Sequence, residues 1–218
     1  MRKSILASFV LCTLTALPLT AAEADLSGLP PVAQSAETAH PIGVGTVVPT
    51  GPLLDIDGHP FDLSASIRAT PSVLIFYRGG WCPYCNLQMD QLIALEPRLK
   101  TLGYQILAIS PDKPESLRES LHKHPINYTL LSDSPMIVSR KFGLAWDMGK
   151  MNGLIMKVLG KDLIKASGQS HYWLPVPAAY VVDKNGRITY SFYDPDFTKR
   201  VDPNQLYQAA QAALSSAH

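Results

Sequence analysis

The sequence predicts a mixed three-layer α/β sandwich, with helices packed on a central β-sheet. Short apolar segments that suit buried strands alternate along the chain with longer segments whose apolar residues recur at helical spacing. Strands separated by helices pair in parallel through right-handed crossovers, and a late pair of strands around the turn Asp183–Gly186 adds an antiparallel edge. An apolar content of 46% is enough for a sizeable core.

Local signals justify the elements one by one. Asp57-Gly58 is a typical hairpin turn, and Pro83 suits the first turn of a helix, where no N–H is needed. That helix carries the stripe Leu92, Leu95 and Leu99, while Pro97 is a residue that bends or splits helices. In chain order we expect a hairpin over 53–63, a strand Val73–Tyr77, a helix Pro83–Thr101, a strand Tyr104–Ile109, a helix Pro114–His122, a strand Tyr128–Leu131, a short helix Pro135–Phe142, strands Ala179–Val182 and Arg187–Tyr193, and a helix Pro203–Leu214.

The segment Leu144–Trp173 is longer than a plain crossover needs, and it is rich in Trp, Met, Leu and Ile. Two interpretations stay open. It forms a cap or a partner surface over the functional site, or it adds one more packed helix, because an apolar stripe at helical spacing usually faces a core.

The N-terminus predicts a secretory signal peptide over residues 1–22. Arg2 and Lys3 precede an apolar run from Ile5 to Leu19, and small residues follow at Thr20–Ala22 as a cleavage site requires. Residues 23–44 are rich in Pro, Ala and Ser and are expected to form a flexible arm, so the folded domain spans 45–218. The protein is therefore expected in the periplasm or secreted, without a stable membrane anchor after cleavage.

Cleavage would also remove Cys12 and leave Cys82 and Cys85 as the two cysteines of the mature chain. Loss of Arg2 and Lys3 from the 19 basic side chains would leave 17 of them against 18 acidic ones. This near balance gives no reason to expect nucleic acid or an acidic membrane surface as a partner.

The segment Trp81–Cys85 is the strongest functional signal. Two cysteines one helical turn apart, directly after an apolar strand, can form a reversible disulfide. Cys82 would sit at a helix N-terminus, where free N–H groups and the helix dipole stabilise a thiolate, and Arg78 could add positive potential. Cys82 is therefore the expected nucleophile, and Cys85, one turn further in, the expected resolving thiol.

Two structural alternatives compete with this redox pair. A zinc site would need four ligands, and no second Cys pair complements the first. A purely structural disulfide is plausible outside the cytoplasm, but a bridge across so short a loop removes little chain entropy. We expect no bound metal, flavin or nucleotide, because Gly79-Gly80 alone is too short for a phosphate-binding loop.

The motif resembles the thioredoxin fold, since a Trp-Cys-X-X-Cys segment joins a strand to a helix and Val176-Pro177 precedes a later strand. The resemblance is closer to the peroxiredoxin-like branch of the alkyl hydroperoxide reductase and thiol-specific antioxidant family. It rests on segments spread over most of residues 45–214: Gly51–Leu63, Phe76–Cys85, Ser132–Pro135, Lys141–Gly143, Leu174–Pro177 and Asp194–Arg200. The resemblance implies a thioredoxin-like three-layer sandwich with a mixed central sheet and an N-terminal hairpin extension.

The resemblance also implies a cis bond between Val176 and Pro177. Such a bond would expose the Val176 backbone beside Cys82, where an extended substrate chain could pair with it. Trp81, Val176 and Pro177 are therefore the expected substrate-docking residues. On residue pattern alone a trans loop residue at Pro177 is favoured, because cis bonds are a small minority of X–Pro bonds.

The family hosts two chemistries, and this chain departs from the pattern of each. Peroxiredoxins place a Thr three residues before the peroxidatic Cys, where this chain has Gly79. Thioredoxins place a buried Asp six residues before the first Cys, where this chain has Phe76. The Pro83-Tyr84 dipeptide is similar to that of glutaredoxins and favours disulfide exchange.

The first expectation is therefore a secreted or periplasmic thiol–disulfide oxidoreductase. The alternative is a peroxiredoxin-like antioxidant that reduces hydrogen peroxide or organic hydroperoxides, and the third is a non-catalytic binding domain. Expected partners are protein or small-molecule thiols and disulfides, peroxides on the second interpretation, and a redox partner protein. Whether the pair gives or takes electrons depends on its reduction potential.

Overall fold

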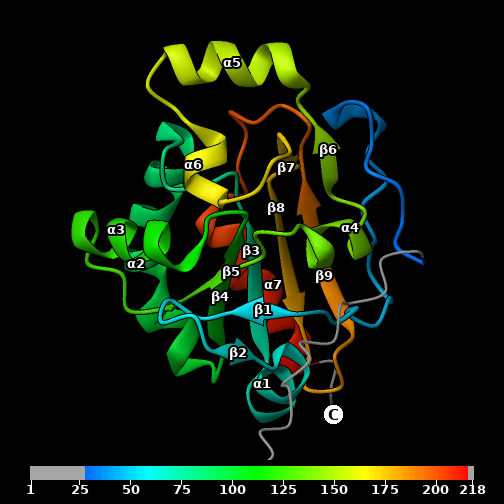
Figure 1. Ribbon diagram of the computed structural model, residues 1–218. Coiled ribbons are helices and arrows are strands. Elements are labelled where there is room, and N and C mark those ends of the chain that lie inside the picture. Colours follow the sequence, from blue (N-terminus) through cyan, green and yellow to red (C-terminus); the bar gives the residue numbers. More distant parts are fainter. Residues whose placement is uncertain (1–27, 216–218) are drawn as a thin grey trace, which may run out of the picture.

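The computed structural model describes residues 28–215 (Figure 1). The expected signal peptide lies outside these residues. Among the helices that the structure describes, none is both long and apolar enough to cross a membrane.

The core of the molecule is a seven-stranded sheet in the order β2-β1-β5-β4-β3-β8-β9. Strands β3, β4 and β5 are parallel, whereas β1, β8 and β9 pair antiparallel with their neighbours. The bounds are Leu53–Leu54 for β1, Pro60–Phe61 for β2, Ser72–Phe76 for β3, Gln105–Ser110 for β4, Thr129–Ser132 for β5, Ala178–Val182 for β8 and Ile188–Tyr193 for β9. The mixed sheet and its N-terminal hairpin confirm the predicted fold class.

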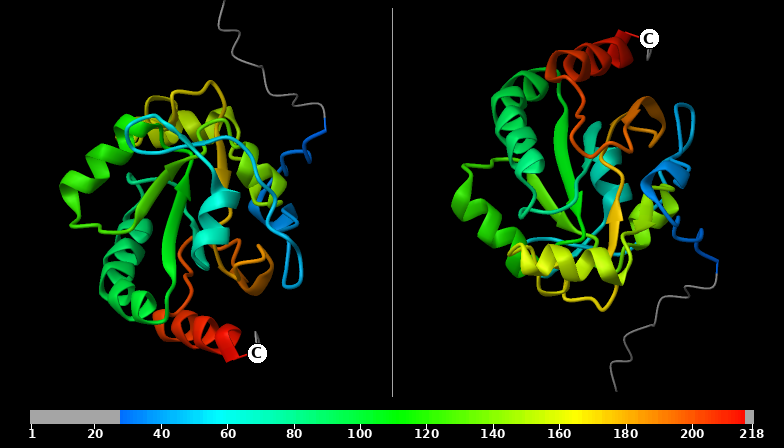
Figure 2. Two further views of the ribbon diagram at one scale, coloured as in Figure 1. Left: turned by 90° about the horizontal axis from the view of Figure 1, so that it is seen from below. Right: turned by 90° about the horizontal axis from the view of Figure 1, so that it is seen from above.

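Helices cover both faces of this sheet (Figure 2). On one face, α2 (Pro83–Thr101), α3 (Pro114–Lys123) and α7 (Pro203–Ser215) enclose a core that includes both cysteines. On the other face, α1 (Leu63–Ala69) and α4 (Ile137–Lys141) pack on the alternate side chains of the same strands. The central strand β3 is buried at every position, as expected of a strand covered on both sides.

Helix α2 has the predicted bounds and continues through Pro97 without a break. Its first turn needs no N–H from Pro83, and its apolar stripe faces the sheet. The hairpin ends earlier than expected, at Phe61 instead of residue 63. Helix α1 follows because Asp62 caps it by accepting the N–H of Ala65 at 2.9 Å.

The segment Leu144–Trp173 is not a single packed helix. Strands β6 (Ala145–Asp147) and β7 (Trp173–Pro175) form a separate antiparallel hairpin, which carries α5 (Lys150–Val158) and α6 (Leu163–Ser167). Helix α5 lies across the end of the sheet at the top of Figure 1 and buries only Gly153. The interpretation of this segment as a cap is therefore the one that the structure supports.

Two further expectations differ from the structure. Residues 28–44 are packed instead of flexible: Ala33 exchanges hydrogen bonds with β6, the N–H of Ile42 donates to Phe142, and the 3₁₀ turn η1 (Ala36–Thr38) buries Ala36. The expected cis bond at Pro177 is also wrong, because no peptide bond in residues 28–215 is cis. The N–H of Val176 donates to the Leu144 carbonyl at 2.8 Å, so the backbone before Pro177 is held beside the start of β6.

Candidate active site

The loop between β3 and α2 presents the cysteine pair. The N–H of Cys82 donates to the Gly79 carbonyl at 3.1 Å, and Cys82 then caps α2 with an extended backbone. Its carbonyl accepts the N–H groups of Cys85 and Asn86, so the helix begins at the predicted residue. Cys82 thus lies at the positive end of a 19-residue helix dipole.

The two thiols are free, adjacent and different in acidity. Each is about 1% exposed. The Cys85 thiol donates a hydrogen bond to the Cys82 sulfur, and this bond together with the Cys85 N–H and two guanidinium groups lowers the pKa of Cys82 to about 5. The same hydrogen bond and burial raise the pKa of Cys85 well above its ordinary value. Cys82 is therefore a thiolate at neutral pH, whereas Cys85 keeps its proton.

Arg78 and Arg200 are the source of the positive charge. Arg78 is 5% exposed, lies 4.3 Å from the ring centre of Phe197 and 5.2 Å from that of Trp81, and its charge lowers the pKa of Cys82. Arg200, between β9 and α7, directs its Nη2 to the Cys85 Sγ at 3.4 Å. The Nε groups of both arginines are buried without a hydrogen-bond partner among the described residues. These donors are available to an oxygen-bearing ligand.

This thiolate predicts a specific pH profile for alkylation. Above pH about 5 the Cys82 thiolate is present, and its reaction with iodoacetamide is lost as the pH falls through that value. We expect a rise in rate whose midpoint lies near pH 5, measured by mass spectrometry of the Cys82 peptide. The absence of a rise near pH 5 would contradict the geometry.

Gly79, which stands where peroxiredoxins carry Thr, cannot take a side chain. Its φ is +134°, and a Cβ would lie 2.5 Å from Trp81 Nε1 and 2.7 Å from Asp112 Oδ1. We expect Gly79→Thr to cost at least about 2 kcal/mol in the free energy of unfolding and to slow Cys82 oxidation. Chemical denaturation measures the first effect, and Gly45→Thr, with a positive φ but open space, is the control. A faster reaction in Gly79→Thr would refute this view.

A cavity of about 420 Å³ opens on Cys82 between the β3–α2 loop and the cap. Its walls are mainly apolar, with Trp81 from the loop, Phe197 from the β9–α7 connection, and Trp146, Met148, Ile155 and Met156 from the cap. Arg78 and Lys161 are the charged side chains of this lining. The cap therefore supplies half of the residues that line the entrance to the thiolate.

The structure brings only some of the expected site residues together. Trp81, Cys82 and Arg78 meet at the cavity, and Cys85 lies directly behind. Val176 and Pro177 differ: the Val176 side chain is fully buried on the opposite face of the sheet, and its N–H is used by Leu144. No open backbone edge is available at Val176 for a docked strand.

Sequence reasoning missed Asp112, and it did not place Arg200 near the cysteines. Asp112 lies two residues after the end of β4, the parallel neighbour of β3, and the carboxyl ends of parallel strands lie at one edge of a sheet. That rule could have placed Asp112 near Cys82. No comparable signal exists for Arg200, whose position depends on tertiary packing. The apolar composition of Leu144–Trp173 indicated a cap as one interpretation, but not which of its residues line the cavity.

Among the described residues, close metal-ligand atoms occur together at Asp55, Asp57 and His59 in the β1–β2 turn. The Asp55 carboxylate already accepts the N–H groups of Asp57 and His59 at 2.8 and 2.9 Å. These bonds account for the cluster as turn chemistry.

Comparison with known proteins identifies the family. Residues 44–191 match the AhpC/TSA family model. Peroxiredoxin Bcp of Escherichia coli K12 is 32% identical over 133 residues, which are 60% of this chain and 83% of the relative, and a chloroplastic peroxiredoxin Q of Gentiana triflora is 30% identical over 122 residues, 56% of each chain. The crystal structure of peroxidoxin BcpB from Mycobacterium tuberculosis has a TM-score of 0.60 at 19% identity, covering 78% of this chain and 97% of that one.

The expectation that disulfide exchange is the main activity is wrong, because these relatives are named peroxiredoxins. The argument for disulfide exchange rested on two residues, Pro83 and Tyr84. The family match is stronger evidence because it covers most of the folded chain. The chain belongs to the AhpC/TSA family and is a peroxiredoxin-like, thiol-dependent redox enzyme with a thioredoxin-like fold.

Proposed function

We propose that this protein is a thiol-dependent peroxidase in which Cys82 attacks the peroxide and Cys85 resolves the product. The observation that carries the proposal is the Cys82 thiolate, set between a helix N-terminus and the Arg78 guanidinium at the end of a cavity. The names of the relatives support the same reaction.

The reaction balances with the groups present. The Cys82 thiolate attacks the distal oxygen of ROOH, the O–O bond breaks, and the leaving alkoxide takes a proton to give ROH and a Cys82 sulfenic acid. The Cys85 sulfur, as it loses its proton, then attacks the Cys82 sulfur, releasing water and forming the Cys82–Cys85 disulfide. Two electrons and two protons from an external thiol reductant restore both thiols.

In place of the family's Thr, we propose that guanidinium N–H groups hold the peroxide. Arg78 Nε is buried and unpartnered beside the thiolate, so it can donate to the oxygen on which charge develops. The backbone N–H groups at the start of α2 supply the remaining positive potential.

The apolar cavity favours organic hydroperoxides over hydrogen peroxide. We expect kcat/KM for cumene hydroperoxide to exceed that for hydrogen peroxide by about tenfold. Only the organic peroxide has an apolar group that gains free energy from burial in this cavity. Ile155→Lys, on the cavity wall, should remove most of this preference. Val158→Lys, on the same helix but 87% exposed and outside the lining, should keep it, and equal ratios in all three proteins would refute the assignment.

The function is tested by stopped-flow measurement of tryptophan fluorescence after the reduced protein is mixed with each peroxide, since Trp81 and Trp146 line the cavity on Cys82. We expect one equivalent of peroxide to oxidise the Cys82–Cys85 pair within seconds, while insulin disulfides are reduced negligibly under the same conditions. Slow oxidation by every peroxide, with rapid insulin reduction, would overturn the proposal.

We further propose that the protein acts in the periplasm or after secretion and draws electrons from a thiol-bearing partner. The basis is the apolar run after Arg2 and Lys3. Expression of the full chain followed by cell fractionation and N-terminal sequencing tests this location. A mature protein that starts near residue 23 in the periplasm is expected, and an uncleaved cytoplasmic protein would contradict it.

A further inference from the structure

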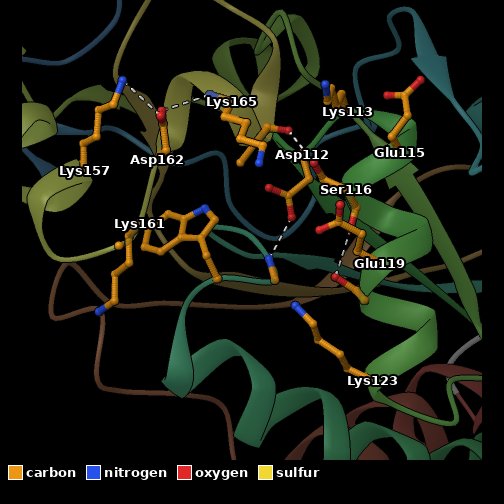
Figure 3. Close-up of a pocket in the computed structure, with 15 residues that line it drawn as sticks. Asp112, Lys113, Glu115, Ser116, Glu119, Lys123, Lys157, Lys161, Asp162 and Lys165 are labelled. Atoms are coloured by element: carbon orange, nitrogen blue, oxygen red, sulfur yellow. Dashed lines mark hydrogen bonds and ion pairs between the residues drawn. The ribbon is translucent and has the colours of Figure 1, made fainter.

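Asp112 is a buried carboxyl group that the reaction described above does not use. It lies two residues after the end of β4 and is 2% exposed. Its Oδ2 accepts the N–H of Gly80 in the active-site loop at 2.7 Å, and its own N–H donates to Ser110 Oγ at 3.2 Å. Figure 3 shows Asp112 on the wall of a second cavity, of about 490 Å³, next to α3. This cavity gives the carboxyl a route to solvent.

The loop packs closely on Asp112 at Gly79 and on Ser120 of α3 at Gly80, so a Cβ at either position would clash. A Cβ on Gly79 would lie 2.7 Å from Asp112 Oδ1, and a Cβ on Gly80 would lie 2.2 Å from Ser120 Oγ. Trp81 follows at once and separates the two cavities, since it lines both. The contacts with Asp112 and Ser120 therefore hold residues 79–81, directly before Cys82, in place.

We propose that Asp112 is a positioning residue of the active site: its carboxylate holds the Gly80 N–H and thereby the loop that presents the Cys82 thiolate, and protonation of Asp112 loosens this hold. The inference rests on the proposed peroxidase function for its meaning in catalysis. Its geometric part concerns the thiolate alone and is measurable without peroxide.

Charge on Asp112 changes in the neutral range. Burial raises its pKa to about 7, against the effect of the Gly80 N–H. An ionised acceptor makes a shorter and stronger hydrogen bond than a neutral one, so the loop is held best above this pH. Several titratable groups face Asp112 or share its cavities. They are Tyr77, just after β3; Lys113, Glu115, Glu119 and Lys123 from α3 and its N-cap; Lys157, Lys161, Asp162 and Lys165 from the cap; and His171 before β7.

Two pH transitions are therefore expected in the reactivity of Cys82. The first, near pH 5, is the ionisation of Cys82 itself. The second lies near pH 7, where Cys82 is already a thiolate and acidity no longer limits its reaction. A rise in the reaction rate near pH 7 therefore reports a better position of the thiolate.

The experiment measures iodoacetamide alkylation and peroxide oxidation of Cys82 from pH 4.5 to 9 in the wild type, Asp112→Asn and Asp112→Ala. The wild type should show a second rise of about fivefold near pH 7, the scale of one strengthened hydrogen bond. Asp112→Asn keeps an acceptor for Gly80 but no charge, so it should match the wild type below pH 6 and lack the second rise. Asp112→Ala should be slower throughout.

Asp133→Asn is the matched control. Asp133 is also buried after a strand and accepts backbone N–H groups, at 3.1 Å from Val138 and 2.7 Å from Ser139, but these belong to α4 on the other face of the sheet. This variant should lose thermal stability and keep both transitions. A second rise that persists in Asp112→Asn, or its absence in the wild type, would overturn the proposal.

The two assays separate this inference from the proposed function. If alkylation shows the Asp112 effect while peroxide fails to oxidise Cys82, the positioning role stands and the peroxidase function fails. If peroxide oxidises Cys82 rapidly but neither assay depends on Asp112, the peroxidase stands and the inference fails.

Discussion

Replacing Cys82 with serine is expected to abolish oxidation by peroxide, with a loss on the order of 10³-fold or more, because a serine hydroxyl stays protonated and is a poor nucleophile. The structure directs the helix dipole and the charges of Arg78 and Arg200 at this one sulfur. Stopped-flow oxidation of the reduced variant measures the effect. A Cys82→Ser protein that still consumes peroxide stoichiometrically would move the nucleophile to Cys85.

Cys85→Ser separates the two chemical steps and is the matched partner of that variant. A serine hydroxyl at residue 85 can still donate a hydrogen bond to the Cys82 thiolate, so the first step should remain within about threefold of the wild type. The second step is lost, because no thiol attacks the sulfenic acid. Dimedone should therefore label Cys82 in Cys85→Ser after one equivalent of peroxide, and should label the wild type weakly. Equal labelling would show that Cys85 does not resolve.

The sequence was sufficient to predict the features that local chemistry determines. The bounds of α2, the place of Cys82 at its N-terminus and the succession of the central strands along the chain follow from Pro83, from helical spacing and from short apolar runs. These signals act over one or two turns or one strand, so they can be recognised from a single chain.

The rest of the site depends on contacts between distant parts of the chain. Arg200 contacts Cys85, which is 115 residues away in the sequence. Gly80 donates a hydrogen bond to Asp112, which is 32 residues away. The expectation of substrate docking at Val176 and Pro177 was wrong for a related reason. No local pattern predicted the β6–β7 hairpin, and beside it the Leu144 carbonyl accepts the Val176 N–H that a docked substrate would need. The cap could be recognised only as the apolar stretch Leu144–Trp173. Its composition suits a cap and a packed helix equally well, so the sequence left both interpretations open.

Arg78→Met is expected to slow peroxide oxidation by about 10²-fold, the usual effect of removing one donor from a site of developing negative charge. Methionine keeps the apolar part of the contacts with Trp81 and Phe197 but removes the charge that lowers the pKa of Cys82. The midpoint of the acid transition in alkylation, near pH 5 in the wild type, should therefore move to higher pH. Raising the pH should recover the alkylation rate, and it should not recover the peroxide rate, because the donor to the leaving oxygen is missing at every pH.

Arg98→Met is the control for this charge. Arg98 lies on the far turns of the same helix, where its guanidinium is 4.1 Å from the Tyr207 ring centre and its Nη1 donates to Asn204. Its loss removes an equal charge and a similar ring contact while leaving the Cys82 environment intact, so both rates should stay near wild type. If Arg98→Met and Arg78→Met slow oxidation equally, the effect of Arg78 is general electrostatics and not contact with the reacting oxygen. If high pH restores full peroxidase activity to Arg78→Met, the arginine acts only on the thiol and the helix N-terminus alone stabilises the transition state.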